Sequence, residues 1–466
     1  MSEYIHDLID WQFIISGLVL AIGVHAVLGL VAYGVYLERK ICSYIQDRIG
    51  PNRVGLDFGL PFLSFFKGML ALGQPLADGI KFFVKEDFTP KNVDRTLFTL
   101  APLLAVVPAL IGFVVMPWGG TLEVPAAADM VAFQYMFDLP VVGDAFYFMF
   151  GHLQAQSVLV SGANVHVGII YLLAVGSLGV YGVTLAGWSS NNKYSMLGGL
   201  RATAQMISYE IPLGLALLCA LLIAGSFIPN EIVQYQAEHG WLLWSMPLPA
   251  ILFYVCGLAE ANRAPFDNAE AEQELVGGFH TEYSSMRFAL FFMAEYAHLV
   301  TACAFFTLLF LGGYNLPLVG LTSPETTGLL AVLAKVGVFG FKVVLMVCFA
   351  IVVRWTVPRL RYDQVMMLGW QGMIPAGMLM LVVTSVMVYL GQTTIVPMFI
   401  ANVFMLVVIL IGQYVLAKSF GRSTLNRKIP LYGSRYSPME GEQVVTAPRV
   451  PMAIEDRPVQ GTVSTV

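Results

Sequence analysis

An acidic segment between two apolar stretches carries the residues best suited to chemistry. It reads 258-LAEANRAPFDNAEAEQELVGGFHTEYSSMRFALFFMAEY-296. Carboxylates held close together in a low dielectric repel one another, which raises the pKa of some of them. Groups of that kind hold or release a proton near neutral pH, so the segment favours a proton path over a solvated acidic loop. Its acidic residues and arginines are Glu260, Arg263, Asp267, Glu270, Glu272, Glu274, Glu282, Arg287 and Glu295.

Further ionisable residues lie in or beside apolar stretches elsewhere in the chain. Asp78 and Lys81 are neighbours on one face of an expected helix, where they form either a solvated ion pair or a half-buried site. Glu210, followed closely by Pro212, is either paired or on a proton route. Lys342 lies inside an apolar stretch, so it belongs either to a buried structural ion pair or to a proton relay.

The elements that position these residues are membrane helices. The chain is 57% hydrophobic and only 12% charged, whereas soluble domains are about 25% charged. We therefore predict an all-α polytopic membrane protein, with amphipathic helices in its cytoplasmic loops. Stretches near the length of about 20 residues that crosses a bilayer predict nine spans, at 12–36, 96–117, 164–187, 206–225, 242–259, 288–313, 328–353, 372–390 and 395–417.

The positive charges predict the orientation of these spans. Segment 38–95 holds nine Lys and Arg residues, while the next connection, 118–163, holds none, and the alternation continues along the chain. Positive residues gather on the cytoplasmic side, so we expect the N-terminus outside and the C-terminus in the cytoplasm. The acidic segment Met1–Trp11 lacks the basic region of a signal peptide. The first span should therefore remain in the mature protein.

The cysteines and histidines show no pattern of metal ligands. The five cysteines form no CxxC pair and the histidines no HExxH motif, so we predict no metal, haem or cluster on this chain. The segment 418–466 gains Pro, Arg and Ser and is expected to be a largely disordered cytoplasmic tail.

Six motifs together resemble one protein family. They are LERK, RIGPN, QPLADGIKFFVKE, GGLRATAQMISYE, the acidic segment quoted above and PRLRYDQVM. In this order they resemble the H subunit of complex I, the proton-pumping NADH:quinone oxidoreductase, over about residues 12–390. The resemblance implies a quinone-chamber domain at 1–390, followed here by an additional helix at 391–417 and the tail at 418–466.

The resemblance also implies residue roles, cofactors and partners. Quinone (ubiquinone or menaquinone) is the implied substrate, while NADH, flavin and iron–sulfur clusters would bind to partner subunits. Those partners are the quinone-site and iron–sulfur subunits of the hydrophilic arm and small membrane subunits beside the antiporter-like ones, in a bacterial inner membrane and without nucleic acid. The implied quinone-chamber residues are Glu38, Arg39, Arg48, Asp78 and Lys81. The implied proton-coupling residues are Glu210, Glu260, Arg263, Asp267, Glu270, Glu272, Glu274, Glu282, Glu295 and, from its place in a span, Lys342. The implied contact with the hydrophilic arm is Arg361, Tyr362 and Asp363.

Three alternatives remain beside this interpretation. A related membrane subunit of a hydrogenase or formate hydrogenlyase shares the ancestry, and a nickel-binding large subunit encoded nearby would favour it. A stand-alone secondary transporter would explain the spans, but not the gathering of acids in one loop. A purely structural anchor predicts that neutralising Asp78 or Glu282 affects assembly only.

Overall fold

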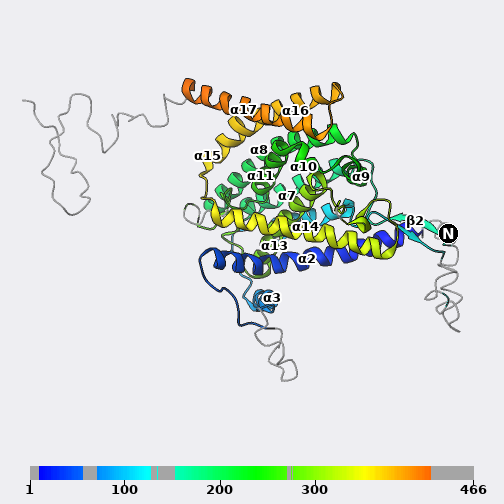
Figure 1. Ribbon diagram of the computed structural model, residues 1–466. Helices are drawn as coiled ribbons and strands as arrows, with labels where there is room; N and C mark the ends of the chain where they lie inside the picture. The colour runs from blue at the N-terminus through cyan, green and yellow to red at the C-terminus, as the bar shows by residue number, and fades with distance from the viewer. Residues whose placement is uncertain are drawn as a thin grey trace, which may run out of the picture. The chain divides into compact units, whose positions relative to one another are not determined.

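The structure, a computed structural model, describes residues 10–55, 71–126, 134, 153–269, 274, 276–317 and 319–420, with side chains up to 415. The described part is mainly helical (Figure 1). The chain forms two compact units, Met1–Leu406 and Val407–Val466. Most of the predicted tail, from residue 421 onward, lies outside the described residues. The predicted domain boundaries at 390 and 417 stay predictions.

Eight helical segments in the described part are long and apolar enough to cross a membrane. This confirms the predicted class, an all-α polytopic membrane protein. The eight segments are α2 (Trp11–Ile45), α4 (Arg95–Ile111) continued by the 3-10 turn η2 (Gly112–Val115), α7 (Gly168–Ser189), α8 (Lys193–Ala224), α13 (Ser285–Phe310), α14 (Leu329–Thr356), α15 (Tyr362–Met367) continued by the π-helical η6 (Leu368–Met373) and α16 (Ile374–Tyr389), and α17 (Ile395–Phe420).

The predicted span at 242–259 differs from the others because it is broken. It consists of α10 (Leu242–Ser245) and α11 (Pro247–Glu260), which meet at Met246. Pro247 accounts for the break, since proline lacks an N–H and its ring crowds the preceding helical turn. At 1.5 Å per residue, α11 alone covers about 21 Å and the two helices together about 28 Å. Only the pair approaches the hydrocarbon thickness of a bilayer, about 30 Å.

The remaining elements lie in the connections between the long helices. They are α3 (Gln74–Val84), α9 (Pro229–His239), the 3-10 turns η4 (Gly278–His280) and η5 (Gly320–Thr322), and the strands β1 (Thr121–Val124) and β2 (Gln156–Leu159). The two strands pair antiparallel, with Thr121 opposite Leu159. They join the two ends of the long connection 118–163, of which residues 127–133 and 135–152 lie outside the described part.

Polar side chains fix where several helices begin. The Asp10 carboxylate accepts a hydrogen bond from the Trp11 amide at 2.8 Å, at the start of α2. Asp94 and Asn192 accept backbone N–H groups in the same way at α4 and α8. Such caps satisfy N–H groups that have no partner within the helix. At its other end, α8 stops at Gly225, whose φ of 69° suits glycine.

Close packing of α4, α7, α8, α11 and α13 forms the core of the first unit. A Cβ atom at Gly182 of α7 would lie 2.6 Å from the Ala105 backbone nitrogen of α4, so the two helices approach this closely only because residue 182 is glycine. The Phe98 and Tyr283 rings stack with centroids 4.0 Å apart in the same core. On the other side, α14 and α2 pack against α13 (Figure 1).

Candidate functional site

A large cavity of about 830 Å³ lies between α2, α3, α13 and the end of α14. Glu38, Arg39, Asp78 and Lys81 line it, and these are four of the five predicted chamber residues. The fifth, Arg48, is exposed on the turn after α2, outside the lining of the cavity. Apolar groups such as Val31, Phe292 and Trp355 make up most of the rest of the wall.

One ion pair joins α2 to α3 across this cavity. Arg39 and Asp78 lie 3.0 Å apart, with side chains that are 47% and 28% exposed. Gln74 donates a further hydrogen bond to Asp78 at 3.1 Å. Asp78 therefore pairs with Arg39 from another helix, and not with Lys81, its neighbour along α3. The aspartate faces the half-buried site that the sequence left open as an alternative to a solvated pair.

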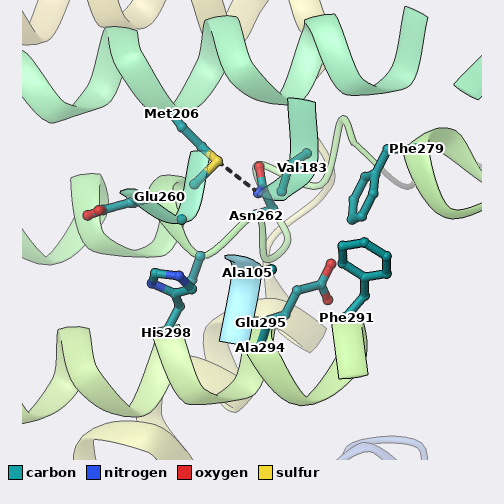
Figure 2. A pocket seen from close by; sticks show the side chains of 12 residues that line it. Ala105, Val183, Met206, Glu260, Asn262, Phe279, Phe291, Ala294, Glu295 and His298 are labelled. Atoms are coloured by element: carbon teal, nitrogen blue, oxygen red, sulfur yellow. Dashed lines mark hydrogen bonds between the residues drawn. The ribbon is translucent and has the colours of Figure 1, made fainter. Parts of the chain in front are cut away.

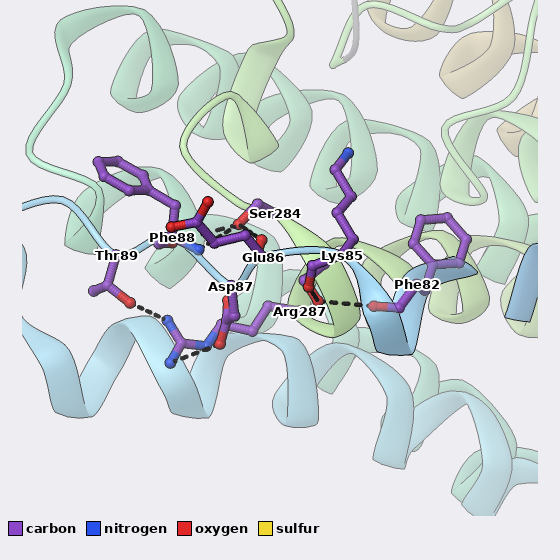
Figure 3. Close-up of polar contacts among 9 residues, drawn as sticks. Phe82, Lys85, Glu86, Asp87, Phe88, Thr89, Ser284 and Arg287 are labelled. Carbon is purple, nitrogen blue, oxygen red and sulfur yellow. Dashed lines mark hydrogen bonds and ion pairs between the residues drawn. The ribbon is translucent and has the colours of Figure 1, made fainter. Parts of the chain in front are cut away.

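Contacts with the start of α13 hold α3 in place (Figure 3). The Ser285 hydroxyl donates to the Phe82 and Lys85 carbonyls at 2.8 and 2.9 Å. Arg287 contacts Asp87 at 3.4 Å and donates to the Thr89 hydroxyl at 2.9 Å. The C-terminal end of α3 is thereby fixed to the bundle, which sets the position of Asp78 in the cavity wall.

A second ion pair lies deeper in the same wall. Glu38, only 8% exposed, contacts Arg354 from α14 at 2.5 Å and accepts a hydrogen bond from the Tyr296 hydroxyl. Arg263 lies over the Tyr296 ring, 4.1 Å from its centroid, and contacts Glu295 at 3.3 Å. These contacts run without a gap from the cavity wall into the interior of the bundle.

Two small cavities continue inward from Glu295. The first, about 20 Å³, is lined by Glu295, Glu260 and His298, as Figure 2 shows. The second, about 40 Å³, is lined by Glu210, Glu260 and His298. Glu210 also accepts a hydrogen bond from the Ser177 hydroxyl on α7. The structure thus brings Glu295, Glu260 and Glu210 together, although they come from three different helices.

A buried amide holds the loop that follows Glu260. The Gln205 side-chain nitrogen donates to the Ala259 carbonyl at 2.9 Å and the Phe266 carbonyl at 2.7 Å. Its side-chain oxygen accepts from Asn268 at 3.1 Å. Gln205 is fully buried, so these bonds compensate for its removal from water. They fix the backbone on which Arg263 stands.

The other predicted acids are spread over the end of the bundle and do not share one site. Asp267 is half-buried in the loop after α11. Glu274 pairs with Arg201 at 2.8 Å, and Glu282 accepts a hydrogen bond from Asn192 at 2.6 Å. Glu270 and Glu272 lie outside the described residues.

Tyr283, next to Glu282, is deeply buried. Burial raises the pKa of its phenol to about 12, because removal from water disfavours the charged form. It lies 3.3 Å from the Ser189 hydroxyl. Tyr283 therefore stays neutral throughout the physiological pH range and acts there as a hydrogen-bonding group.

Lys342 lies away from these carboxylates. Its ammonium donates to the Leu311, Gly313 and Asn315 carbonyls at 2.7, 2.9 and 2.7 Å. The Trp241 ring covers it at 4.6 Å from the centroid. Within the described part of the chain this lysine forms no ion pair with a carboxylate. Its ammonium is instead solvated by backbone carbonyls of the segment that follows α13.

The predicted contact with the hydrophilic arm lies on the surface at the start of α15. Arg361 and Asp363 lie 3.9 Å apart and are 78% and 68% exposed. The Arg201 guanidinium lies 5.4 Å from the centroid of the Tyr362 ring. The Tyr209 hydroxyl donates to the Val365 carbonyl at 2.9 Å, which ties α15 to the helix that carries Glu210.

Sequence reasoning missed four residues that the structure places at the site: Arg354, Tyr296, His298 and Gln205. Arg354 entered only as one of the positive charges that set the orientation. Tyr296 and His298 follow Glu295 within one helical turn, and this spacing was a usable signal. Nothing in the sequence around Gln205 indicates its role, because that role depends on the loop after Glu260, to which its side chain is hydrogen-bonded.

Comparison with known proteins identifies the family. The family model described as "NADH dehydrogenase" matches residues 18–385. The chain belongs to the NADH dehydrogenase family. Similar proteins include the H 1 subunit of NADH-quinone oxidoreductase from Geobacter sulfurreducens, 44% identical over 364 residues, or 78% of this chain and 92% of the relative. The H subunit from Leptospira biflexa is 42% identical over 81% of this chain and 96% of the relative. The H 1 subunit from Cytophaga hutchinsonii is 38% identical over 81% and 98%. The family match includes every helix from α4 to α14 and ends before α17.

Proposed function

We propose that this chain is the membrane subunit of a proton-translocating NADH:quinone oxidoreductase that forms the quinone chamber and the start of the proton-coupling path. The observation that carries the proposal is the 830 Å³ cavity, in which apolar walls meet the Arg39–Asp78 pair. Ligand sites combine apolar linings with a few placed polar groups. The apolar wall suits an isoprenoid tail, and the ion pair offers donors and acceptors to a quinone head group. The names of the relatives favour this enzyme over the hydrogenase alternative.

The residues of this chain would bind and orient the quinone and deliver protons to it. Electrons would come from the iron–sulfur clusters of a partner subunit, which in turn are fed by NADH and flavin elsewhere in the complex. A quinone that accepts electrons develops negative charge on its oxygens. Arg39 would attract that charge, and its hold on Asp78 would weaken as a result. Asp78 would then take up a proton more readily, because an opposite charge nearby is what favours its ionised form.

The proton-coupling path would follow the contacts described above. A change of charge in the cavity reaches Glu38, whose partners are Arg354 and Tyr296. Arg263 lies between Tyr296 and Glu295 and would pass the change on through electrostatic coupling. From Glu295 the two small cavities lead past Glu260 to Glu210. Coupled carboxylates titrate together, so protonation at one end alters the proton affinity at the other.

The complex would lie in the bacterial inner membrane, with the N-terminus outside and the C-terminus in the cytoplasm. The broken α10–α11 segment would supply the ninth crossing that this orientation requires. Arg361, Tyr362 and Asp363 would then face the cytoplasm, where their exposure suits contact with the hydrophilic arm. The acids after α11 would lie at the same face. Small membrane subunits would cover the side of the bundle at the Glu210 end of the path, and would connect that end to the pumping subunits.

The test is the NADH:quinone reductase activity of membranes that carry Asp78→Asn, with assembly measured as the amount of intact complex. We expect quinone-linked activity to be lost while NADH oxidation by an artificial acceptor is retained. The neighbouring exposed variant Glu86→Gln serves as the control for charge in the same segment. Full quinone activity in Asp78→Asn would contradict the role of this cavity in quinone chemistry.

A further inference from the structure

His298 lies where the two small cavities meet. It projects from α13 and lines both the 20 Å³ cavity that contains Glu295 and the 40 Å³ cavity that contains Glu210. Of the described ionisable side chains that line these cavities, only Glu260 does the same. Figure 2 shows the imidazole beside Glu260, with Glu295 further along the same helix. Glu295 and Glu210 themselves line different cavities.

A glycine on α7 makes room for this imidazole. A Cβ atom at Gly179 would lie 2.5 Å from the His298 Nε2 atom, closer than real Cβ contacts allow. The ring therefore packs directly against the α7 backbone. In the described part of the chain no hydrogen bond to the ring nitrogens of His298 is formed. The ring nitrogens are thus left to interact with whatever the two cavities hold.

Each cavity is large enough for water and offers it polar partners. A site of roughly 10–15 Å³ holds one water molecule, and the cavities measure about 20 and 40 Å³. Carboxylates line both of them, which supplies the polar partners that a buried water requires. Both cavities beside His298 therefore contain groups that can donate a proton to the imidazole or accept one from it.

We propose that His298 transfers protons between the Glu295 cavity and the Glu210 cavity, as a proton-transfer residue of the coupling path. This inference rests on the proposed function. A neutral imidazole accepts a proton at one ring nitrogen and donates from the other. One nitrogen would take a proton from the carboxylic acid or water of one cavity, and the other N–H would release its proton to the carboxylate or water of the second. One proton enters and one leaves, and rotation of the ring restores the starting tautomer.

The carboxylates around the ring supply the groups that exchange protons with His298. Glu295, Glu260 and Glu210 are the acidic groups that line the two cavities, and among the described residues no Lys or Arg does so. The nearby guanidinium of Arg263 contacts Glu295. A change of charge in the large cavity would reach Arg263 through Glu38 and Tyr296. Glu295, which Arg263 contacts, would be the first carboxylate of the small cavities to respond. His298 would then pass the proton toward or away from Glu210, whose cavity Arg263 does not line.

The experiment compares three variants of the intact complex reconstituted in lipid vesicles: His298→Asn, His298→Gln and His298→Ala. NADH oxidation by an artificial acceptor measures assembly. We expect quinone-linked turnover in the Asn and Gln variants to fall by about 100-fold or more, the usual scale when a proton-transfer group is lost, and proton translocation per electron to fall with it. Added imidazole should restore turnover in His298→Ala, because it replaces the missing group. Restoration by imidazole but not by benzene, a ring of similar size without a proton-carrying nitrogen, distinguishes proton transfer from packing, since either molecule can fill the space left by the side chain.

Unaltered turnover and translocation in both His298→Asn and His298→Gln would overturn the inference, as would a loss in His298→Ala that imidazole does not relieve. Glu210→Gln is measured beside them as the reference. If Glu210→Gln is impaired while the histidine variants are not, the coupling path stands and the assignment of His298 fails. If Glu210→Gln is also unaltered, the proposed path itself fails.

Discussion

Glu38 on α2 and Arg354 on α14 form an ion pair of 2.5 Å in the inner wall of the large cavity. Two helices that are distant in sequence are thereby joined at the point where the cavity meets the interior of the bundle. The carboxylate is buried and the guanidinium is about a fifth exposed. Removing one member of such a pair leaves the other charge without compensation.

We expect Glu38→Gln to lower both quinone activity and the stability of the complex. Breaking a buried pair costs about 3–5 kcal/mol, and the partial exposure of Arg354 places the expected loss at the lower end of that range or below it. The measurement is the temperature at which the intact complex is lost, together with quinone-linked turnover. Glu86→Gln, at an exposed position after α3, is the control and should have no effect on either.

The double variant Glu38→Gln with Arg354→Gln tests whether the two side chains act as a pair. Residues in one ion pair usually show a coupling of about 0.5–3 kcal/mol. We therefore expect the double variant to be more stable than the sum of the single losses predicts. Strictly additive losses would show that the contact contributes nothing to stability.

Glu210→Gln and Glu295→Gln should reduce turnover and proton translocation while the complex still assembles. Glutamine keeps the size of the side chain and part of its hydrogen bonding, but does not carry a proton as a carboxylate does. The measurement is the number of protons translocated per electron in sealed vesicles. An unchanged ratio in both variants would remove these residues from the path.

Lys342 allows its two proposed roles to be separated. Lys342→Met leaves the Leu311, Gly313 and Asn315 carbonyls without their donor, at about 1–3 kcal/mol for each group that remains buried and unsatisfied. If the role is structural, the heat stability of the complex falls and translocation per electron in the surviving complex is unchanged. If Lys342 belongs to the proton relay, translocation falls even at temperatures where the complex is intact. Lys342→Arg, which keeps the charge, is the matched control.

Gly182→Ala should disturb the bundle more than Gly214→Ala does. The added methyl group at 182 would lie 2.6 Å from the Ala105 backbone, whereas at 214 there is nothing within 4 Å. Overpacking in a tight core costs about 1–3 kcal/mol, so the yield and heat stability of the complex should fall only for the first variant. Equal yields would mean that α4 and α7 can separate without loss.

The sequence was sufficient for the class of fold because hydropathy is a local property. Each long apolar segment, such as 168–189, predicts its own helix without reference to the others. The broken segment at 242–260 was harder, since its total length suits a span and the interruption is marked only by the prolines that begin α11.

The partners of the charged residues could not be predicted in this way. Local spacing left open an ion pair between Asp78 and Lys81, whereas the chain fold brings Arg39 within 3.0 Å of the aspartate. Glu38 and Arg354 were both visible as charges, yet nothing in the sequence states that α2 and α14 lie side by side. The importance of Gln205 arises entirely from a loop that is distant in sequence, and that of His298 arises in part from Glu260 and Gly179 on other helices.

The glycine at position 179 has a consequence for how variation in this chain is interpreted. It carries no charge and forms no bond with a proton carrier, yet the imidazole occupies the space that any other residue there would fill. A single methyl group at Gly179 would lie 2.5 Å from the His298 Nε2 atom, so the ring would have to move from its place between the two cavities. A neutral, apolar substitution of the mildest kind would then reproduce the loss of an ionisable side chain. A search confined to residues that titrate would overlook such a position, because the contribution of Gly179 is the space that its missing side chain leaves for the imidazole.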